Sequence, residues 1–185
     1  LGLELYNSIL AGIAMDGKSF FYVNPLEVWP DNCMNRTSME HVKPVRQKWF
    51  GVACCPPNIA RTIADLQSLI YSVDEERLYV HQYIGSEREV TLPSGTFRLI
   101  QESELPWKGR SVFRFESENP VSGELALRIP QWCVRYSLTM NQHSVTDFSV
   151  ERGYLVDLGE FGSGLTNLLR VLDAQDIRLT RAPSV

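Results

Sequence analysis

The stretch WFGVACCPPNIAR, residues 49–61, sets two adjacent cysteines and two prolines in front of an amphipathic segment. Apolar residues then recur at helical spacing, at Ile59, Ile63, Leu66 and Ile70. Pro57 suits the first turn of a helix, where its missing N–H would have no partner anyway. We therefore predict that Cys54 and Cys55 lie at the N-terminal end of a helix.

Two thiols at this position indicate a reactive or metal-binding site. The unpaired N–H groups and the positive end of the helix dipole stabilise a thiolate there, and the prolines stiffen the turn that presents both sulfurs. Metal ligation and nucleophilic attack both fit, but a tetrahedral zinc site needs about four ligands and a catalytic one about three from protein. Two small residues in a tight turn, or a strained vicinal disulfide, are the structural alternatives.

Three other residues are local candidates to complete a metal site. His41 lies in a polar stretch, and we interpret it most simply as a solvated loop histidine. His81, in LYVHQYI, is typical of a strand residue with an ordinary hydrogen-bond partner. Cys33 has no ligand-like spacing, so we interpret it as incidental.

Composition excludes several classes of partner. The chain has 185 residues, 44% of them hydrophobic, and a net charge of -4 with scattered basic residues. This predicts a soluble globular chain with no nucleic-acid or membrane-surface partner. No apolar run approaches the roughly 20 residues of a membrane span. The four cysteines lack the pattern of a disulfide framework, which favours a reducing, cytoplasmic compartment, with Cys133 as a small buried hydrophobe.

The chain changes character near residue 72. Before it, helical spacing of Leu3, Tyr6, Leu10 and Ile13 predicts a helix that ends at Asp16 and Gly17, then a short strand in FFYVNP and a long loop over 31–48. After it come short alternating runs with turn residues between them: RLYVHQYI, REVTL, TFRLI, SVFRFES, GELALRIP, YSLTM, GYLVDL and IRLT. We predict an α+β fold, with a helical part over 1–72 and an antiparallel β-sandwich over 73–185. Because the start LGLELYN has no initiator Met, we expect the helical part to complete a larger domain.

Three segments together resemble one known family. They are LYNSILAGIAMDGKSFFYVNPLE, HVKPVRQKWFGVACCPPNIAR and LYVHQYIGS, and CCPPN is the most specific part. The chain resembles glycoside hydrolase family 127, the β-L-arabinofuranosidases. LALRIPQW and GYLVDL are similar to the family's β-domain. The resemblance implies the last helices of an (α/α)6 barrel followed by a β-sandwich.

The resemblance also implies a reaction. Members of the family are retaining hydrolases that release L-arabinofuranose from β-linked plant oligosaccharides, with a zinc-bound cysteine as nucleophile. By position, Cys54 matches the nucleophile and Cys55 a second zinc ligand, so both would bind one zinc ion. Tyr22 matches a tyrosine near the sugar, with a core tyrosine as the alternative. The family's acid/base glutamate and third zinc-binding cysteine would precede Leu1, so we expect the chain alone to be inactive.

Two other classes of function stay open. The β-sandwich could be a non-catalytic carbohydrate-binding or oligomerisation module, and a homodimer stays open as a partner. Its aromatic residues at strand ends, Trp107 and Trp132, could stack on sugars, although packing is favoured for both. A structural zinc module would instead have a closed site of four ligands.

Overall fold

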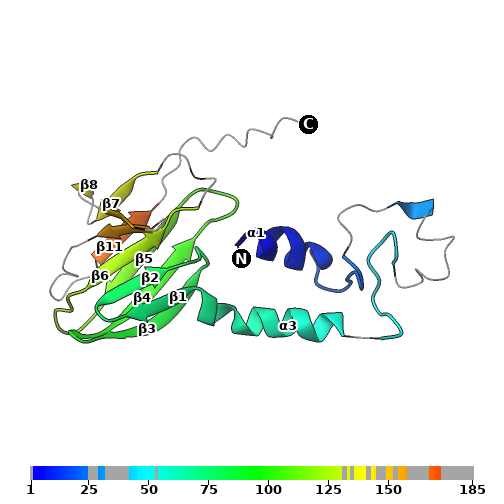
Figure 1. Ribbon diagram of the computed structural model, residues 1–185, viewed down its shortest axis with the longest axis horizontal. Coiled ribbons are helices and arrows are strands. Elements are labelled where there is room, and N and C mark those ends of the chain that lie inside the picture. The colour runs from blue at the N-terminus through cyan, green and yellow to red at the C-terminus, as the bar shows by residue number, and fades with distance from the viewer. Residues whose placement is uncertain are drawn as a thin grey trace. The chain divides into compact units, whose positions relative to one another are not determined.

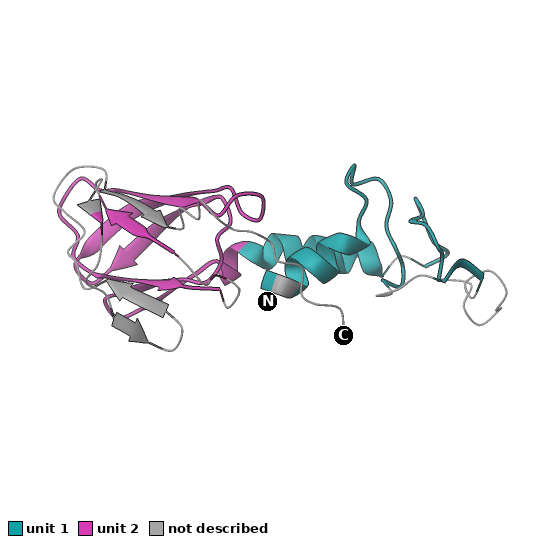
Figure 2. Ribbon diagram, turned by 90° about the horizontal axis from the view of Figure 1, so that it is seen from above, with its two compact units in different colours: residues 1–66 teal, residues 67–185 magenta. Residues whose placement is uncertain are grey.

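The computed structural model describes residues 2–24, 29–31, 42–52, 54–130, 133, 136–140, 143–144, 149–151, 154–157 and 167–171. The chain divides into two compact units, residues 1–66 and 67–185 (Figure 2). Helices dominate the first unit and strands the second (Figure 1). Mixed α+β structure with few helices is therefore confirmed.

The first unit opens with an irregular helical stretch. It comprises α1 (Gly2–Glu4), the π-helical η1 (Leu5–Ile9) and the 3₁₀-helical η2 (Leu10–Gly12). The helix predicted from the apolar spacing is present, but Ile13 is outside it with φ -104° and ψ 142°. Ile13 instead bridges Phe20, and a turn follows in which Gly17 has φ +69°. That left-handed conformation is one that glycine adopts without steric cost.

The strand predicted in FFYVNP is reduced to isolated bridges. Phe20 exchanges two main-chain hydrogen bonds of 3.0 Å with Gln47. The rings of Phe20 and Phe50 lie 5.3 Å apart and both side chains are buried, as are Leu5 and Val42. These contacts hold residues 20–22 beside the segment that leads to the cysteines. Most of the predicted loop, residues 32–41, lies outside the described part.

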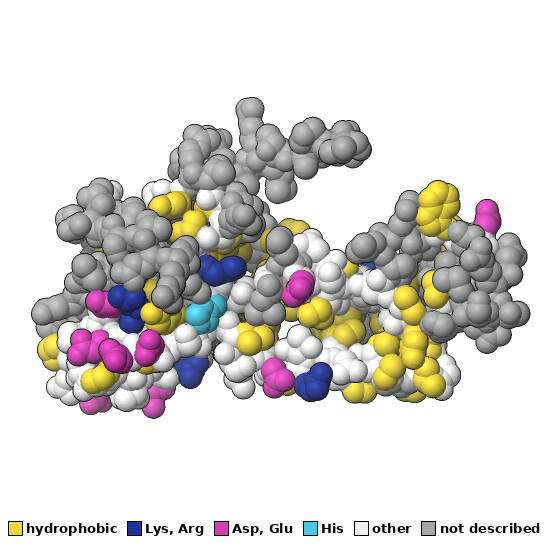
Figure 3. All heavy atoms as spheres, in the orientation of Figure 1, with side chains coloured by type: hydrophobic (Ala, Val, Ile, Leu, Met, Phe, Trp, Pro, Cys, Tyr) yellow, Lys and Arg dark blue, Asp and Glu magenta, His cyan; other side chains and the backbone are white. Residues whose placement is uncertain are grey.

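The predicted helix after the cysteines is confirmed as α3 (Cys55–Asp65), and η4 (Leu66–Leu69) extends it. Its apolar stripe is not covered by the described residues: no side chain of α3 is buried, and Ile63 is 50% exposed. Hydrophobic side chains are prominent on the surface of the first unit in Figure 3. Among the described residues of this unit, the large hydrophobic side chains that are exposed are Leu10, Met15, Trp29, Val45, Trp49, Val52 and Ile63.

The second unit consists of two sheets. The first has the order β1-β2-β6-β10-β9, and the second β3-β4-β5-β11-β7-β8. The strand bounds are β1 (Tyr71–Asp74), β2 (Arg77–Val80), β3 (Ser86–Leu92), β4 (Gly95–Ser103), β5 (Ser111–Glu116), β6 (Glu124–Arg128), β7 (Leu138–Met140), β8 (His143–Ser144), β9 (Ser149–Glu151), β10 (Tyr154–Asp157) and β11 (Asn167–Val171).

Both sheets contribute to one hydrophobic core. Leu78 and Leu125 come from the first sheet, and Leu99 and Phe113 from the second. Along β4 every second side chain is buried, as expected for a strand with one face on a core. Cys133 belongs to the same cluster and is 9% exposed, which confirms the prediction that it is a buried hydrophobe.

One pairing departs from the predicted antiparallel pattern. Among the described strands, β2 and β6 run parallel, with Leu78 opposite Leu125, whereas the other pairs are antiparallel. The reason is topological, because the chain leaves the first sheet after β2, forms β3, β4 and β5 in the second, and returns as β6. Strands β1, β8, β9 and β11 were not among the predicted runs.

The prediction that the tryptophans at strand ends pack against other residues is wrong for one of them. Trp107 lies in the turn between β4 and β5 and is 84% exposed, so it does not pack as predicted. Trp132 and the run IRLT, residues 177–180, lie outside the described residues. In the parts of the chain that the structure describes, no helix has the length and apolarity needed to span a membrane.

Candidate active site at the cysteine pair

The two cysteines lie where the sequence predicts, at the start of α3. Cys55 is the first helical residue and Cys54 precedes it with φ -78° and ψ -26°. Both are free thiols with 3.9 Å between their Sγ atoms, so the vicinal disulfide is not formed. Two thiolates on one tetrahedral zinc ion, each with a bond of about 2.3 Å, would lie about 3.8 Å apart. The observed separation therefore fits ligation of a single metal ion.

Tyr22 contacts both cysteines. Its hydroxyl oxygen lies 3.5 Å from Cys54 Sγ, and its main-chain carbonyl accepts a hydrogen bond of 3.1 Å from the Cys55 thiol. The Tyr22 ring lies against Phe50, with 5.6 Å between ring centroids. Tyr22 is therefore held by packing on one side and meets the thiol pair on the other.

These contacts distinguish the two thiols. The Tyr22 hydroxyl, followed by Cys55, stabilises the Cys54 thiolate and lowers the pKa of Cys54. Partial burial, followed by its proximity to Cys54, raises the pKa of Cys55. The hydrogen bond to Cys54 raises the pKa of Tyr22, because an ionised phenol could no longer donate to sulfur. In the absence of metal, these shifts give Cys54 a larger thiolate fraction than Cys55.

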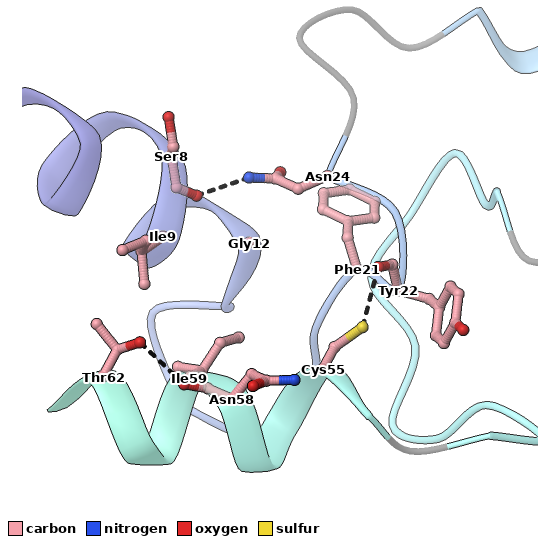
Figure 4. Close-up of a pocket in the computed structure, with 10 residues that line it drawn as sticks. All are labelled: Ser8, Ile9, Gly12, Phe21, Tyr22, Asn24, Cys55, Asn58, Ile59 and Thr62. Carbon is pink, nitrogen blue, oxygen red and sulfur yellow. Dashed lines mark hydrogen bonds between the residues drawn. The ribbon is translucent and has the colours of Figure 1, made fainter. Parts of the chain in front are cut away.

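A cleft of about 400 Å³ lies beside Cys55 (Figure 4). Its walls come from the helical stretch over residues 8–12, from residues 21–24 and from the first two turns of α3 (Figure 4). The Nδ2 atom of Asn24 donates to the main-chain oxygen of Ser8 at 2.6 Å and ties two of these walls together. The lining residues combine apolar and polar side chains: Ser8, Ile9, Gly12, Phe21, Tyr22, Asn24, Cys55, Asn58, Ile59 and Thr62. A pocket of this size, lined mainly by apolar groups with a few polar ones, is typical of a small-molecule site.

The described residues include one of the other three candidate ligands. Cys33 and His41 lie outside the described residues. His81 belongs to the second unit, where its Nε2 atom lies 2.7 Å from Ser72 Oγ, which confirms the prediction of an ordinary hydrogen-bond partner. Among the described residues, no group of three or more His, Cys, Asp and Glu side chains is placed to hold a metal ion.

Sequence reasoning missed Asn58 and the cleft. Asn58 follows the two prolines and its side chain bonds back to Cys54, with 2.8 Å between Nδ2 and the Cys54 oxygen. The signal that could have revealed it is spacing, because residue i+4 of a helix lies next to residue i. The cleft depends on contacts between segments far apart in the chain, which helical periodicity does not report.

The fold and the site together describe an α+β chain whose candidate site is a pair of adjacent thiols beside a cleft with polar groups. The family model of the β-L-arabinofuranosidase GH127 catalytic domain matches residues 3–68, and that of the GH127 middle domain matches residues 77–164. The chain belongs to the GH127 family, a family of glycoside hydrolases.

Similar proteins and solved structures support the same family. The chain is 37% identical over 158 residues to a non-reducing end β-L-arabinofuranosidase of Bifidobacterium longum subsp. longum, a match that covers 82% of this chain and 23% of the relative. The structure is similar to that of a GH127 β-L-arabinofuranosidase from Geobacillus stearothermophilus T6, with a TM-score of 0.78, 40% identity and coverage of 91% of this chain and 26% of that one. A further GH127 β-arabinofuranosidase structure gives a TM-score of 0.73 at 27% identity, over 91% of this chain and 27% of the other. The chain thus spans about a quarter of the length of these relatives.

Proposed function

We propose that this chain forms part of the active site of a retaining glycoside hydrolase that releases L-arabinofuranose from β-linked plant oligosaccharides. The observation that carries the proposal is the thiol pair, with 3.9 Å between sulfurs and the Tyr22 hydroxyl 3.5 Å from Cys54. Family membership supports the hydrolase class, and the names of the relatives support the sugar.

The same proposal assigns two parts of the chain to two domains of the larger enzyme. Residues 1–72 would be the last helices of an (α/α)6 barrel, and residues 73–185 a β-sandwich. The helical character of the first unit and the core shared by two sheets in the second support this division. The exposed apolar stripe of α3 also fits a helix that packs against further chain.

Cys54 and Cys55 would hold a zinc ion, and the distance between their sulfurs fits that role. The ion would supply the positive charge that keeps both thiols deprotonated at neutral pH. The described residues offer only these two thiols as a group, and a catalytic zinc site takes about three protein ligands. We therefore propose that the chain alone binds zinc weakly and does not turn over substrate.

Cys54 would act as the nucleophile. Its sulfur forms a bond to the anomeric carbon while the bond from that carbon to the leaving oxygen breaks, and a general acid protonates that oxygen. Water then attacks the same carbon, the carbon–sulfur bond breaks, and two inversions give net retention. Tyr22 would donate a hydrogen bond to the sulfur before attack and to the sugar afterwards.

An activated substrate tests this proposal on the chain itself. A β-L-arabinofuranosyl fluoride has a leaving group that needs little protonation, so the reaction does not depend on a general acid. We expect incubation with zinc to add one pentosyl group to Cys54, as read by peptide mass spectrometry. The Cys54→Ser variant should gain none.

Two comparisons make the result specific. Cys133→Ser removes a thiol of the second unit and should label like wild type, and the α-configured fluoride should label more slowly than the β-anomer. A pentosyl group on Cys133, or equal labelling by both anomers, would show non-specific alkylation. Label on Cys55 with none on Cys54 in the presence of zinc would overturn the assignment of Cys54 as nucleophile.

One observation favours a second function. Trp107 is 84% exposed in a turn where Glu104 and Lys108 form an ion pair of 2.9 Å, so the ring is presented by an ordered loop. An exposed indole is a platform on which a sugar ring can stack. In a carbohydrate-binding module, Trp107→Ala should abolish arabinan binding and Cys54→Ser should leave it unchanged. If Cys54 is the nucleophile, Cys54→Ser should instead abolish the labelling at this position, and Trp107→Ala should leave the labelling unchanged.

A further inference from the structure

The first turn of α3 has an unusual hydrogen-bond arrangement. Pro56 and Pro57 have no N–H to donate. The Cys54 carbonyl receives its helical bond from the main-chain N–H of Asn58, at 3.4 Å, which is long for this type of bond. The side-chain Nδ2 atom of Asn58 donates to the same oxygen at 2.8 Å. The shorter of the two bonds is thus the one made by the side chain.

The bonded carbonyl belongs to the peptide unit that joins the two cysteines. Rotation of this peptide plane changes ψ of Cys54 and φ of Cys55 together, and these angles set the directions of the two Cα–Cβ bonds. The separation of 3.9 Å between the sulfurs therefore depends on the orientation of the plane. The side chain of Asn58 holds this plane by its hydrogen bond to the carbonyl, and Tyr22 separately contacts both thiols.

We propose that Asn58 is a positioning residue, whose side-chain amide locks the peptide between Cys54 and Cys55 so that both sulfurs point at one ligand atom. This inference rests on the proposed function of the cysteine pair. It adds a residue that touches neither sulfur and acts through the backbone alone.

The experiment uses phenylarsine oxide as a probe of the geometry of the pair. Its arsenic forms two As–S bonds with two thiols, and its oxygen leaves as water with the two thiol protons, without change of oxidation state. Binding is measured in the 185-residue chain without zinc, by competition with a small dithiol, and the bridged peptide is identified by mass spectrometry. The readout is therefore independent of catalytic activity.

We expect Asn58→Ala to weaken the arsenical complex about two- to tenfold, the range for loss of one hydrogen bond. Asn58→Asp keeps the size of the side chain, and its charge suits a helix N-terminus, but it offers no N–H and should also weaken binding. Asn58→Ser should recover affinity to within about twofold, because a serine hydroxyl in a helix can donate to the carbonyl four residues before it. The matched control is Arg61→Ala, an exposed change on the same helix at a residue that does not line the cleft, and it should bind like wild type.

Helix content separates positioning from simple stabilisation. Alanine is a better helix former than asparagine, so Asn58→Ala should keep the circular dichroism of wild type while it loses affinity. Equal affinity in Asn58→Ala and wild type, or an equal loss in Arg61→Ala, would overturn the role of Asn58. If wild type forms no arsenical bridge between Cys54 and Cys55, the two sulfurs do not point at one ligand atom. The proposed function would then be wrong as well.

Discussion

The Sγ atom of Cys54 lies 3.5 Å from the hydroxyl oxygen of Tyr22, although 32 residues separate them in sequence. Since this hydroxyl is the main cause of the lowered pKa of Cys54, Tyr22→Phe should raise that pKa. A smaller thiolate fraction near neutral pH should slow alkylation of Cys54 by iodoacetamide, while the rates converge at high pH where the thiol is ionised in both proteins. The measurement is the pH profile of alkylation, read at Cys54 by peptide mass spectrometry.

Tyr6→Phe is the control for this change, because Tyr6 is a partly buried tyrosine of the same unit and burial is what raises its pKa. Its profile should match wild type. Identical profiles for Tyr22→Phe and wild type would mean that the phenol does not tune the nucleophile. Tyr22 would then keep only its carbonyl contact with Cys55.

Gly95 opens β4 with φ +153°, a conformation that side chains rarely adopt, and a Cβ there would meet Val121 Cγ2 at 3.0 Å. We expect Gly95→Ala to lower the free energy of unfolding by about 1–3 kcal/mol. Gly51 is the matched control, because a Cβ at that position has open space around it. Gly51→Ala should change stability by less than about 1 kcal/mol in urea denaturation, and equal effects of the two substitutions would contradict the strain at Gly95.

The sequence predicted α3 and most strands because their signals are local. The period of Ile59 and Ile63, with Pro57 in the first turn, is sufficient to begin a helix at the cysteines. The alternation in TFRLI likewise predicts β4. The end of the first helix was harder to predict, since Ile13 fits the helical period but is drawn into a bridge with Phe20.

The residues of the candidate site were predicted from the adjacent cysteines and, for Tyr22, from the family resemblance, but their contacts were not. CCPPN identified the two thiols, but their relation to Tyr22 depends on the packing of Phe50 under the tyrosine ring. The parallel pair of β2 and β6 is likewise set by a crossover through the other sheet. Trp107 was predicted to pack because tryptophan is apolar, although its turn gives it no neighbouring surface to cover.

Arg77 and Glu124 link the two parallel strands by an ion pair. Two guanidinium nitrogens of Arg77 lie 2.5 Å from Glu124 Oε2, and both side chains are partly shielded from solvent. Glu124→Gln should lower the free energy of unfolding by about 0.5–1 kcal/mol in low salt and by less in high salt, because salt screens the charges. Glu118→Gln, an exposed change outside the strands, is the control. If the loss of unfolding free energy does not depend on salt, its cause is packing and not charge.

Tyr71 should make the protein sensitive to alkaline pH. Burial raises the pKa of Tyr71 from its ordinary value of 10.0 to about 12, while its hydroxyl donates to Gln101 Oε1 at 2.5 Å. The unfolded chain therefore ionises at lower pH than the folded one, so stability is fully present below pH 10 and falls as pH rises through 12. A shift of about two pKa units corresponds to a loss of about 2–3 kcal/mol.

The variant Tyr71→Phe separates this ionisation from other alkaline effects. Near neutral pH it should be less stable than wild type, because Gln101 and Ser86 lose the hydroxyl that bonds to both. Between pH 10 and 12, however, its free energy of unfolding in urea should fall less steeply, because it has no phenol at this position to ionise in the unfolded chain. The two stability curves should therefore approach each other as pH rises. Parallel curves would show that Tyr71 does not govern the alkaline limit of the fold.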